Sequence, residues 1–102
     1  MKIIKGDLIL KENTTFNEDL KVEGNIICEG GRWDLNCKDL NCRDLNCLNL
    51  NCWDLDCRDL DCRDLSFYAV AIAYHSFKCK SWKAKREKYI IKCLDGKIEV
   101  EK

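Results

Sequence analysis

The feature that most constrains this chain is a run of tandem five-residue repeats in its middle third. Cysteine recurs at every fifth position from residue 37 to residue 62, and leucine does so from residue 35 to residue 65. An interval of five fits neither the 3.6-residue period of an α-helix nor the two-residue period of a flat strand. It fits a short strand that turns a corner every five residues. Four such sides would close a square coil of about 20 residues, and stacked coils would pair their backbones about 4.8 Å apart.

The repeats resemble those of the pentapeptide-repeat family, in which a small or apolar residue is followed by Asp or Asn, a central Leu or Phe and two variable residues. The matching frame here is Leu-(Asn/Asp)-Cys-x-(Asp/Asn), with Cys at the centre and Leu in place of the small residue. The Asn/Asp slot is filled in every repeat, by Asn36, Asn41, Asn46, Asn51, Asp56 and Asp61. The resemblance implies an all-β, right-handed quadrilateral β-helix with about 20 residues per coil and terminal β caps.

The leucine and the cysteine of each repeat are expected to point into the core, together with bulky residues that continue the same phase. The predicted core residues are Leu35, Cys37, Leu40, Cys42, Leu45, Cys47, Leu50, Cys52, Leu55, Cys57, Leu60, Cys62, Leu65, Phe67, Ile72, Phe77 and Trp82. Toward the N-terminus, Val22 and Ile27 share this phase. The phase breaks at Gly30 and Gly31, which predicts a bulge or a loop insertion.

We expect a single solenoid domain over residues 1–102. Its predicted parts are an N-terminal cap with an irregular coil (1–32), regular repeats (33–66), degenerate repeats (67–82) and a C-terminal cap or hairpin (83–102).

The two predicted caps differ in their expected structure. In the N-terminal cap, residues 2–10 and 19–28 have the pattern of strands joined by a polar turn. In the C-terminal cap, Asp95 and Gly96 predict the two-residue turn of a β-hairpin. Residues 81–88 fit either a short helix or a loop, and the pattern does not decide between them.

Charge and hydropathy exclude several classes of protein. Lys plus Arg equals Asp plus Glu, at 18 each, so no overall field attracts nucleic acid or anionic lipid. No apolar run approaches the roughly 20 residues that span a bilayer. Gly6 and Asp7 interrupt the stretch in which a signal peptide needs apolar residues. We therefore expect a cytoplasmic protein without membrane association.

Nine cysteines in 102 residues need an explanation of their own. Their regular spacing favours reduced, buried side chains over the irregular disulfide framework of a secreted miniprotein. A metal site is the alternative, because four thiolates from one coil could surround an ion. The leucines that share the interior and the width of the coil disfavour that alternative. We expect no metal and no other cofactor.

Residues directly after each cysteine are expected to point outward, and a coil of about 20 residues would stack positions that far apart. Trp33 would then lie beside Trp53, and Leu48 would lie beside Tyr68. These four residues form the candidate partner surface, because clustered surface aromatics are typical of protein interfaces. The alternative is that Trp and Tyr only cover the corners of the β-helix.

A basic segment follows the repeats, since residues 67–93 hold seven bases and one acid. The candidate anion-binding residues in this segment are Lys83, Lys85, Arg86 and Lys88. Together with neighbouring aromatic residues they could bind phosphates and stack bases. No nucleic-acid-binding motif is present, however, and a solvated cap explains the charge equally well.

The resemblance also raises a second kind of nucleic-acid role. Some members of the pentapeptide-repeat family inhibit DNA gyrase through a rod of acidic, duplex-like surface. Residues 31–66 contain eight acids against five bases, and arginines interrupt the acidic columns. Both features disfavour this role.

Catalytic chemistry has little support in the sequence. His75 is the only histidine, and it lies four residues before Cys79 with no third group to complete a nucleophile and its base. We therefore expect no enzyme but a structural or protein-interaction scaffold, with an unidentified protein partner or self-association. The alternatives are a nucleic-acid-associated or gyrase-modulating protein and, third, a thiol metal-binding or redox protein.

Overall fold

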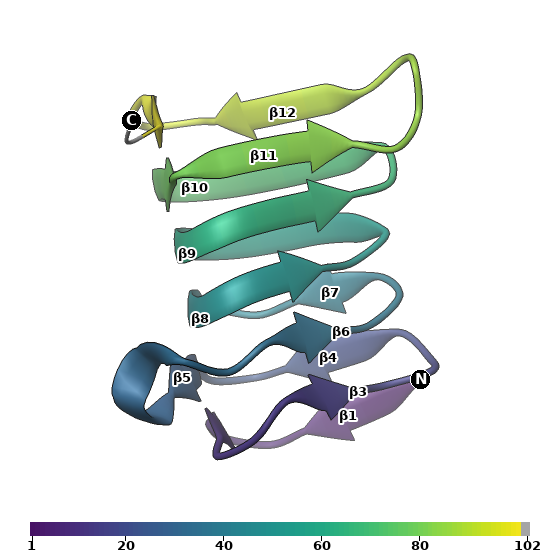
Figure 1. Ribbon diagram of the computed structural model, residues 1–102, viewed down its shortest axis with the longest axis vertical. Coiled ribbons are helices and arrows are strands. Elements are labelled where there is room, and N and C mark those ends of the chain that lie inside the picture. The colour runs from purple at the N-terminus through teal and green to yellow at the C-terminus, as the bar shows by residue number, and fades with distance from the viewer. Residues whose placement is uncertain (101–102) are drawn as a thin grey trace.

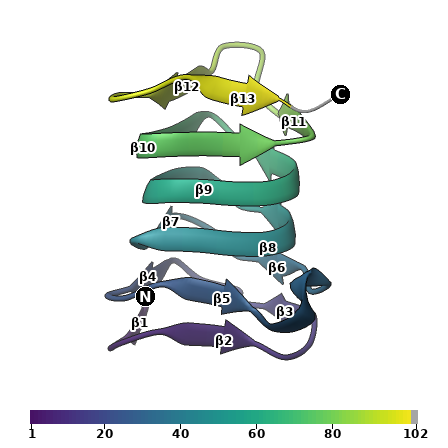
Figure 2. The same ribbon diagram turned by 90° about the vertical axis from the view of Figure 1, so that its left-hand side faces the viewer.

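The chain winds into a right-handed β-solenoid whose laps stack along one axis (Figures 1 and 2). The computed structural model describes residues 1–100, and residues 101–102 of the predicted C-terminal cap lie outside the described residues. In Figure 1 the front strands run to the right and the rear strands run to the left as the chain climbs from its N-terminus, which is right-handed winding. Every strand pairing among the described residues is parallel.

Each lap has three sides, and each side is a short strand or part of a longer one (Figure 2). The first side consists of β1 (Lys2–Ile4), β4 (Leu20–Val22), β7 (Leu40–Asn41), the start of β9 (Asp54–Phe67), the start of β10 (Val70–Cys79) and β12 (Ile90–Cys93). The second side consists of β2 (Leu8–Leu10), β5 (Ile26–Cys28), the start of β8 (Asp44–Asn51), the middle of β9, the end of β10 and β13 (Ile98–Val100). The third side consists of β3 (Thr14–Thr15), β6 (Leu35–Asn36), the ends of β8 and β9, and β11 (Ser81–Ala84).

The regular repeats close a lap with three sides, each one repeat long. Leu40 of β7 pairs with Leu55 of β9, and Leu45 of β8 pairs with Leu60 of β9, so partners on neighbouring laps are three repeats apart. The predicted all-β solenoid is confirmed, whereas the predicted quadrilateral coil of four repeats is wrong for this segment. A five-residue side specifies where a corner falls but not its angle. A triangular lap brings leucine and cysteine side chains together at the axis, which a wider square lap lined by short thiols would not do.

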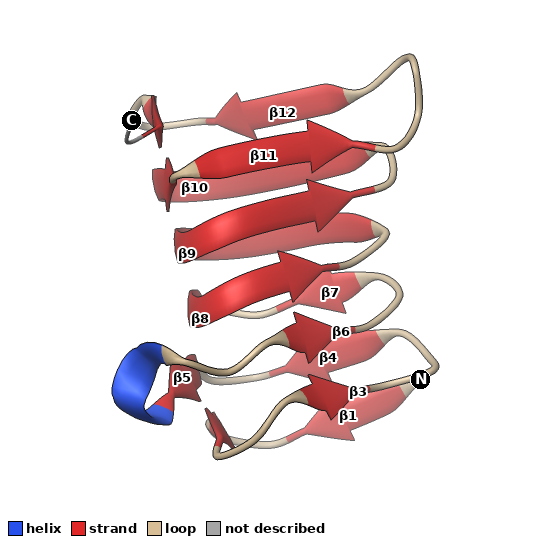
Figure 3. Cartoon of the chain, in the orientation of Figure 1, coloured by secondary structure: helices blue, strands red, loops and turns tan. Residues whose placement is uncertain are grey.

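One lap below the regular repeats is longer, because a loop is inserted at a corner. Leu20 pairs with Leu40, whereas Leu40 pairs with Leu55, so this lap exceeds a regular one by the length of one repeat. The insertion contains the 3-10 helix η1 (Glu29–Gly31), drawn in blue in Figure 3. Gly30 and Gly31 adopt φ angles of 76° and 67° there, which residues with a Cβ rarely adopt. The predicted loop insertion at these glycines is therefore confirmed.

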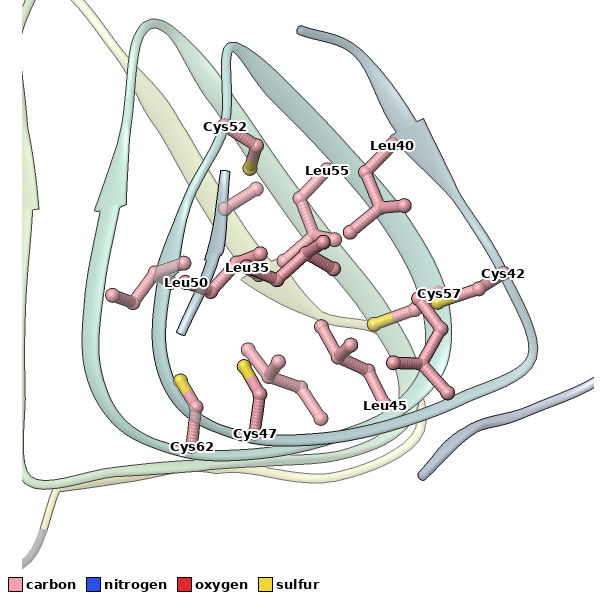
Figure 4. Close-up of a cluster of buried hydrophobic side chains, with 14 of the residues drawn as sticks. Leu35, Leu40, Cys42, Leu45, Cys47, Leu50, Cys52, Leu55, Cys57 and Cys62 are labelled. Atoms are coloured by element: carbon pink, nitrogen blue, oxygen red, sulfur yellow. The ribbon is translucent and has the colours of Figure 1, made fainter. Parts of the chain in front are cut away.

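Leucine and cysteine side chains of the repeats fill the interior (Figure 4). The residues between them face outward. Every predicted core residue from Leu35 to Leu65 is buried, as are Phe67 and Phe77. The core also includes residues that the repeat pattern did not predict, namely Leu10, Ile26, Cys28, Ala71, Ala73 and Cys79. The solenoid thus continues on both sides of the regular repeats.

Ile72 is not a core residue, contrary to the prediction. At the start of β10, Val70 pairs with Asp54 and Ala71 pairs with Leu55, so this lap is one residue longer than the three repeats of a regular lap. One extra residue moves every following side chain to the opposite face of a strand. Ala71 and Ala73 therefore point inward, and Ile72 lies half-buried on the outer face beside Asp56.

Trp82 takes its predicted inward position only in part. It lies in β11 above Leu65 and is partly buried. Its ring stacks on that of Phe67 with centroids 6.1 Å apart, and Tyr89 contacts it edge-on at 5.4 Å. Residues 81–88, for which helix and loop were both open, form the strand β11 followed by a loop.

Both ends of the chain differ from the predicted caps. At the N-terminus, β1, β2 and β3 are sides of a further lap, and β3 occupies the segment predicted to be a polar turn. In the next lap, Ile27 is exposed between the buried Ile26 and Cys28, so its predicted inward phase is wrong. At the C-terminus, β12 and β13 both pair in parallel with β10. The predicted hairpin at Asp95 is therefore wrong, because the edge of the lap below competes with local turn formation.

Carboxylate and amide side chains at the corners bind successive laps to each other. Asp19 accepts a hydrogen bond at Oδ1 from the backbone amide of Asp39, over 3.1 Å. Asp54 accepts one from the amide of Val70 over 3.2 Å, and the same arrangement recurs at the next corner. Each bond satisfies a backbone donor at a bend in the ladder. The Asp and Asn residues before the inward leucines thus have a structural role.

The opposite placement of two similar side chains gives a direct test of the fold. Leu55→Ala should lower the free energy of unfolding by about 2–5 kcal/mol, because it opens a cavity in the core. Ile72→Ala should cost about 1 kcal/mol or less, because its side chain is half in solvent. Urea denaturation followed by circular dichroism measures both. Equal losses would mean that Ile72 is a core residue after all.

Candidate functional site

One corner of the solenoid, formed by the loops on the right of Figure 1, carries four residues that follow one another on successive laps. They are Lys38, Trp53, Tyr68 and Arg86, and we call them the aromatic ridge. The Trp53 amide donates to the Lys38 carbonyl over 3.1 Å, and the Tyr68 amide donates to the Trp53 carbonyl over 2.7 Å. The Arg86 amide continues this ladder to the Tyr68 carbonyl over 3.0 Å. Backbone hydrogen bonds therefore fix the order of the ridge.

The two rings of the ridge are the part that a partner can reach. Trp53 is 51% exposed and Tyr68 is 46% exposed. The Lys38 ammonium lies 5.2 Å from the centroid of the Trp53 ring, which is a cation–π contact. Adjacent exposed rings with a cation at each end are typical of a binding surface, since Trp, Tyr and Arg dominate interface energetics.

The predicted pairing of Trp33 with Trp53 and of Leu48 with Tyr68 is wrong. Because a regular lap has three sides instead of four, Leu48 follows Trp33 at a different corner, where its amide donates to the Trp33 carbonyl over 3.0 Å. Trp33 is partly buried against the core, and its amide donates to Sγ of Cys28 over 3.1 Å. The four predicted surface residues therefore divide into two pairs at different corners, Trp53 with Tyr68 and Trp33 with Leu48. The sequence pattern did not place the two cations of the ridge, Lys38 and Arg86, beside these rings, because their position depends on the number of sides in a lap.

The third corner is dominated by charge pairs. Arg58 donates from Nε to Oδ1 of Asp44 over 3.1 Å and from Nη2 to Oδ2 over 3.2 Å. Its guanidinium also lies 3.7 Å from a carboxylate oxygen of Asp59. These hydrogen bonds hold the pKa of Asp44 below its usual range. The acids at this corner thus have a counter-ion within the protein.

The first side of the solenoid carries acids without such counter-ions. A groove of about 530 Å³ runs over its outer face, and we call it the acidic groove. Its lining includes the carboxylates of Asp19, Asp39, Asp54 and Asp56 and the apolar side chains of Val70 and Ile72. Partial burial raises the pKa of Asp39, and the nearby Asp19 and Asp54 raise it further. No ion pair within residues 1–100 involves a carboxylate of this groove.

The predicted anion-binding residues lie in β11 and in the loop that follows it. Lys83, Lys85, Arg86 and Lys88 are all exposed. Lys85 donates from Nζ to Oδ1 of Asn51 over 3.1 Å, which holds it against the third side. Arg86 belongs to the aromatic ridge, so the predicted basic segment adjoins the ridge at its C-terminal end.

The cysteines are side chains of the core. All nine are free thiols, eight of them are buried, and the six in the regular repeats occupy the inward positions predicted for them (Figure 4). Burial raises the pKa of the Cys47 thiol to about 12, and it raises the pKa of Cys52 as well. The thiolate is the form that binds metals and attacks electrophiles. Within residues 1–100, no three side chains of His, Cys, Asp or Glu are arranged to hold a metal ion.

His75 and Cys79, the one histidine–thiol pair that the sequence offers, do not face each other. His75 is exposed, whereas Cys79 is buried in the core. His75 falls where the pairing of β10 with β9 shifts register, between Ala73 and Ser76. The imidazole of His75 therefore lies on the outer face of β10, and the thiol of Cys79 lies on its inner face.

Comparisons with known proteins place no constraint on this site. No protein-family model, no curated protein and no solved structure matches this chain. Among the described residues, no helix has the length and the apolar character needed to cross a bilayer. A function has to be argued from the surface of the solenoid.

Thiol chemistry should follow burial. In the native protein one thiol, that of the half-buried Cys93, should react quickly with an aromatic disulfide reagent, because the other eight are buried in the core and closed to the reagent. Cys93→Ser should abolish this fast phase, and all nine thiols should react in denaturant. Absorbance of the released thiolate measures the count. Several fast thiols in the native protein would contradict the closed interior.

Proposed function

We propose that this protein is a non-catalytic scaffold that binds another protein through the aromatic ridge. The observation that carries the proposal is the presence of two half-exposed rings, Trp53 and Tyr68, on adjacent laps between Lys38 and Arg86. The backbone hydrogen bonds hold these loops in one conformation, so they lose little conformational freedom when a partner binds. A small loss of conformational entropy on binding raises the affinity of such a preorganised surface.

The size of the solenoid fits this role. A standard interface takes about 800 Å² from each partner. The protein measures 29 × 26 × 22 Å, so an interface of that size would cover the ridge together with one whole side. The partner would therefore contact a side that adjoins the ridge as well as the rings themselves.

The proposal includes a relationship to the pentapeptide-repeat family and a cytoplasmic location. The five-residue sides, and the Asn or Asp before each repeat cysteine, support the relationship. The three-sided lap is a departure from the four-sided coil of that family. Nine free thiols support a reducing compartment.

The ridge can be tested with a matched control. Trp53→Ser combined with Tyr68→Ser should abolish capture of the partner from a native lysate, because it removes both rings. Tyr74→Ser removes a ring that is 43% exposed at another corner, and capture should be unchanged. Circular dichroism establishes that each variant is folded. Equal capture by the double variant and the parent would overturn the proposal.

Binding of nucleic acid is the second candidate, since exposed Lys85 and Arg86 adjoin the Tyr68 ring. For a protein-binding scaffold we expect no shift of single-stranded DNA or RNA in a gel at low salt and micromolar protein, and no inhibition of DNA gyrase. A shift that disappears when Lys83, Lys85, Arg86 and Lys88 are all changed to Ala would favour the nucleic-acid role instead.

A further inference from the structure

The acidic groove lies directly beside the aromatic ridge. Asp39 follows Lys38 in the chain, and Asp54 follows Trp53, so each carboxylate is one residue from a ridge side chain. Val70 lies two residues beyond Tyr68 and lines the same groove. A partner that covers the ridge and the first side of the solenoid therefore has to fill this groove.

The groove has an excess of negative charge that the protein does not neutralise. Four carboxylates line it, and Lys21 is the one basic side chain in the lining within residues 1–100. The amino group of Met1, which also lines the groove, pairs with Glu18 instead. At the neighbouring corner, by contrast, Arg58 neutralises Asp44 through two hydrogen bonds. The raised pKa of Asp39 agrees with an uncompensated cluster of like charges.

The character of the groove changes along the solenoid axis. Its carboxylates lie on the laps below β10, whereas Val70 and Ile72 of β10 provide an apolar lining above them. Ile90 of β12 pairs with Val70 on the next lap and is 48% exposed, so it extends the apolar part. A complementary ligand has cationic groups beside an apolar group.

We propose that the acidic groove binds an extended, basic segment of a partner protein, with Arg or Lys side chains against its four carboxylates and an apolar side chain against Val70 and Ile72. This inference rests on the proposed function and specifies the partner of that same surface. Nucleic acid does not fit the groove, because its phosphates would face four carboxylates without a neutralising partner.

The spacing of the acids matches an extended chain. Asp19 and Asp54 lie two laps apart at the same corner, because Leu20 pairs with Leu40 and Leu40 pairs with Leu55. Two steps between neighbouring strands span about 10 Å. An extended segment rises about 3.3 Å per residue, so two basic residues three positions apart span the same distance. A helix would cover only about 4.5 Å over three positions.

The probe that tests the inference is a fluorescein-labelled peptide with two arginines three positions apart and a leucine at one end. We expect fluorescence anisotropy to show micromolar binding at low salt and about tenfold or greater weakening at high salt. Asp39→Asn and Asp56→Asn should each weaken binding about fivefold, the loss of one partly exposed charge pair. Both variants should fold, because other repeats carry Asn at the equivalent positions, as at Asn49 and Asn41.

Asp61→Asn is the matched control, because Asp61 faces outward from the same strand, β9, on the second side of the solenoid. It should leave the affinity unchanged. Equal weakening by Asp56→Asn and Asp61→Asn would overturn the inference, since it would indicate a general charge effect. Equal binding of a peptide with glutamates in place of arginines would also overturn it, as would binding of a single-stranded oligonucleotide that competes with the arginine peptide.

Failure of this inference can be told apart from failure of the proposed function. If capture of a partner depends on Trp53 and Tyr68 while the arginine peptide does not bind, the chemistry assigned to the partner is wrong and the scaffold function stands. If the double ridge variant captures its partner as the parent does, the proposed function is wrong, and so is the partner assigned to it.

Discussion

The packing of leucine and cysteine inside a three-sided lap is the constraint on which the rest of this structure depends. A narrow interior lets these short side chains meet at the axis, and parallel hydrogen bonds then join each lap to the next one. Every outer residue of the regular repeats consequently lies about 4.8 Å from the residue one lap away. The repeat in the sequence is converted in this way into columns of side chains on the surface.

The cysteines belong to the architecture, which moves any function to the outside. A thiol is a small apolar group, and it alternates with leucine along the repeats (Figure 4). Burial raises the pKa of Cys37 and Cys47 to about 12, so the reactive thiolate is disfavoured near neutral pH. The acids at the corners are in part structural too, because Asp19 and Asp54 accept backbone hydrogen bonds from the next lap.

The outer corners differ from each other although the repeats inside them are nearly uniform. One corner carries two exposed rings on adjacent laps flanked by cations, and another carries the pair of Arg58 and Asp44. At the remaining corner Trp33 packs against the core. The aromatic ridge and the acidic groove meet along one edge. A partner with an apolar residue next to basic ones would find complementary groups there on a backbone that is already rigid.

The five-residue interval alone determined the length of each side, the burial of leucine and cysteine, and the break at Gly30. It did not determine the number of sides, because a corner angle depends on how side chains from all sides pack across the axis. Only the tertiary structure therefore placed Tyr68, and not Trp33, beside Trp53. A single added residue in the lap below β10 likewise turned Ile72 outward. At the C-terminus, pairing with the free edge of β10 outweighed the local preference for a hairpin.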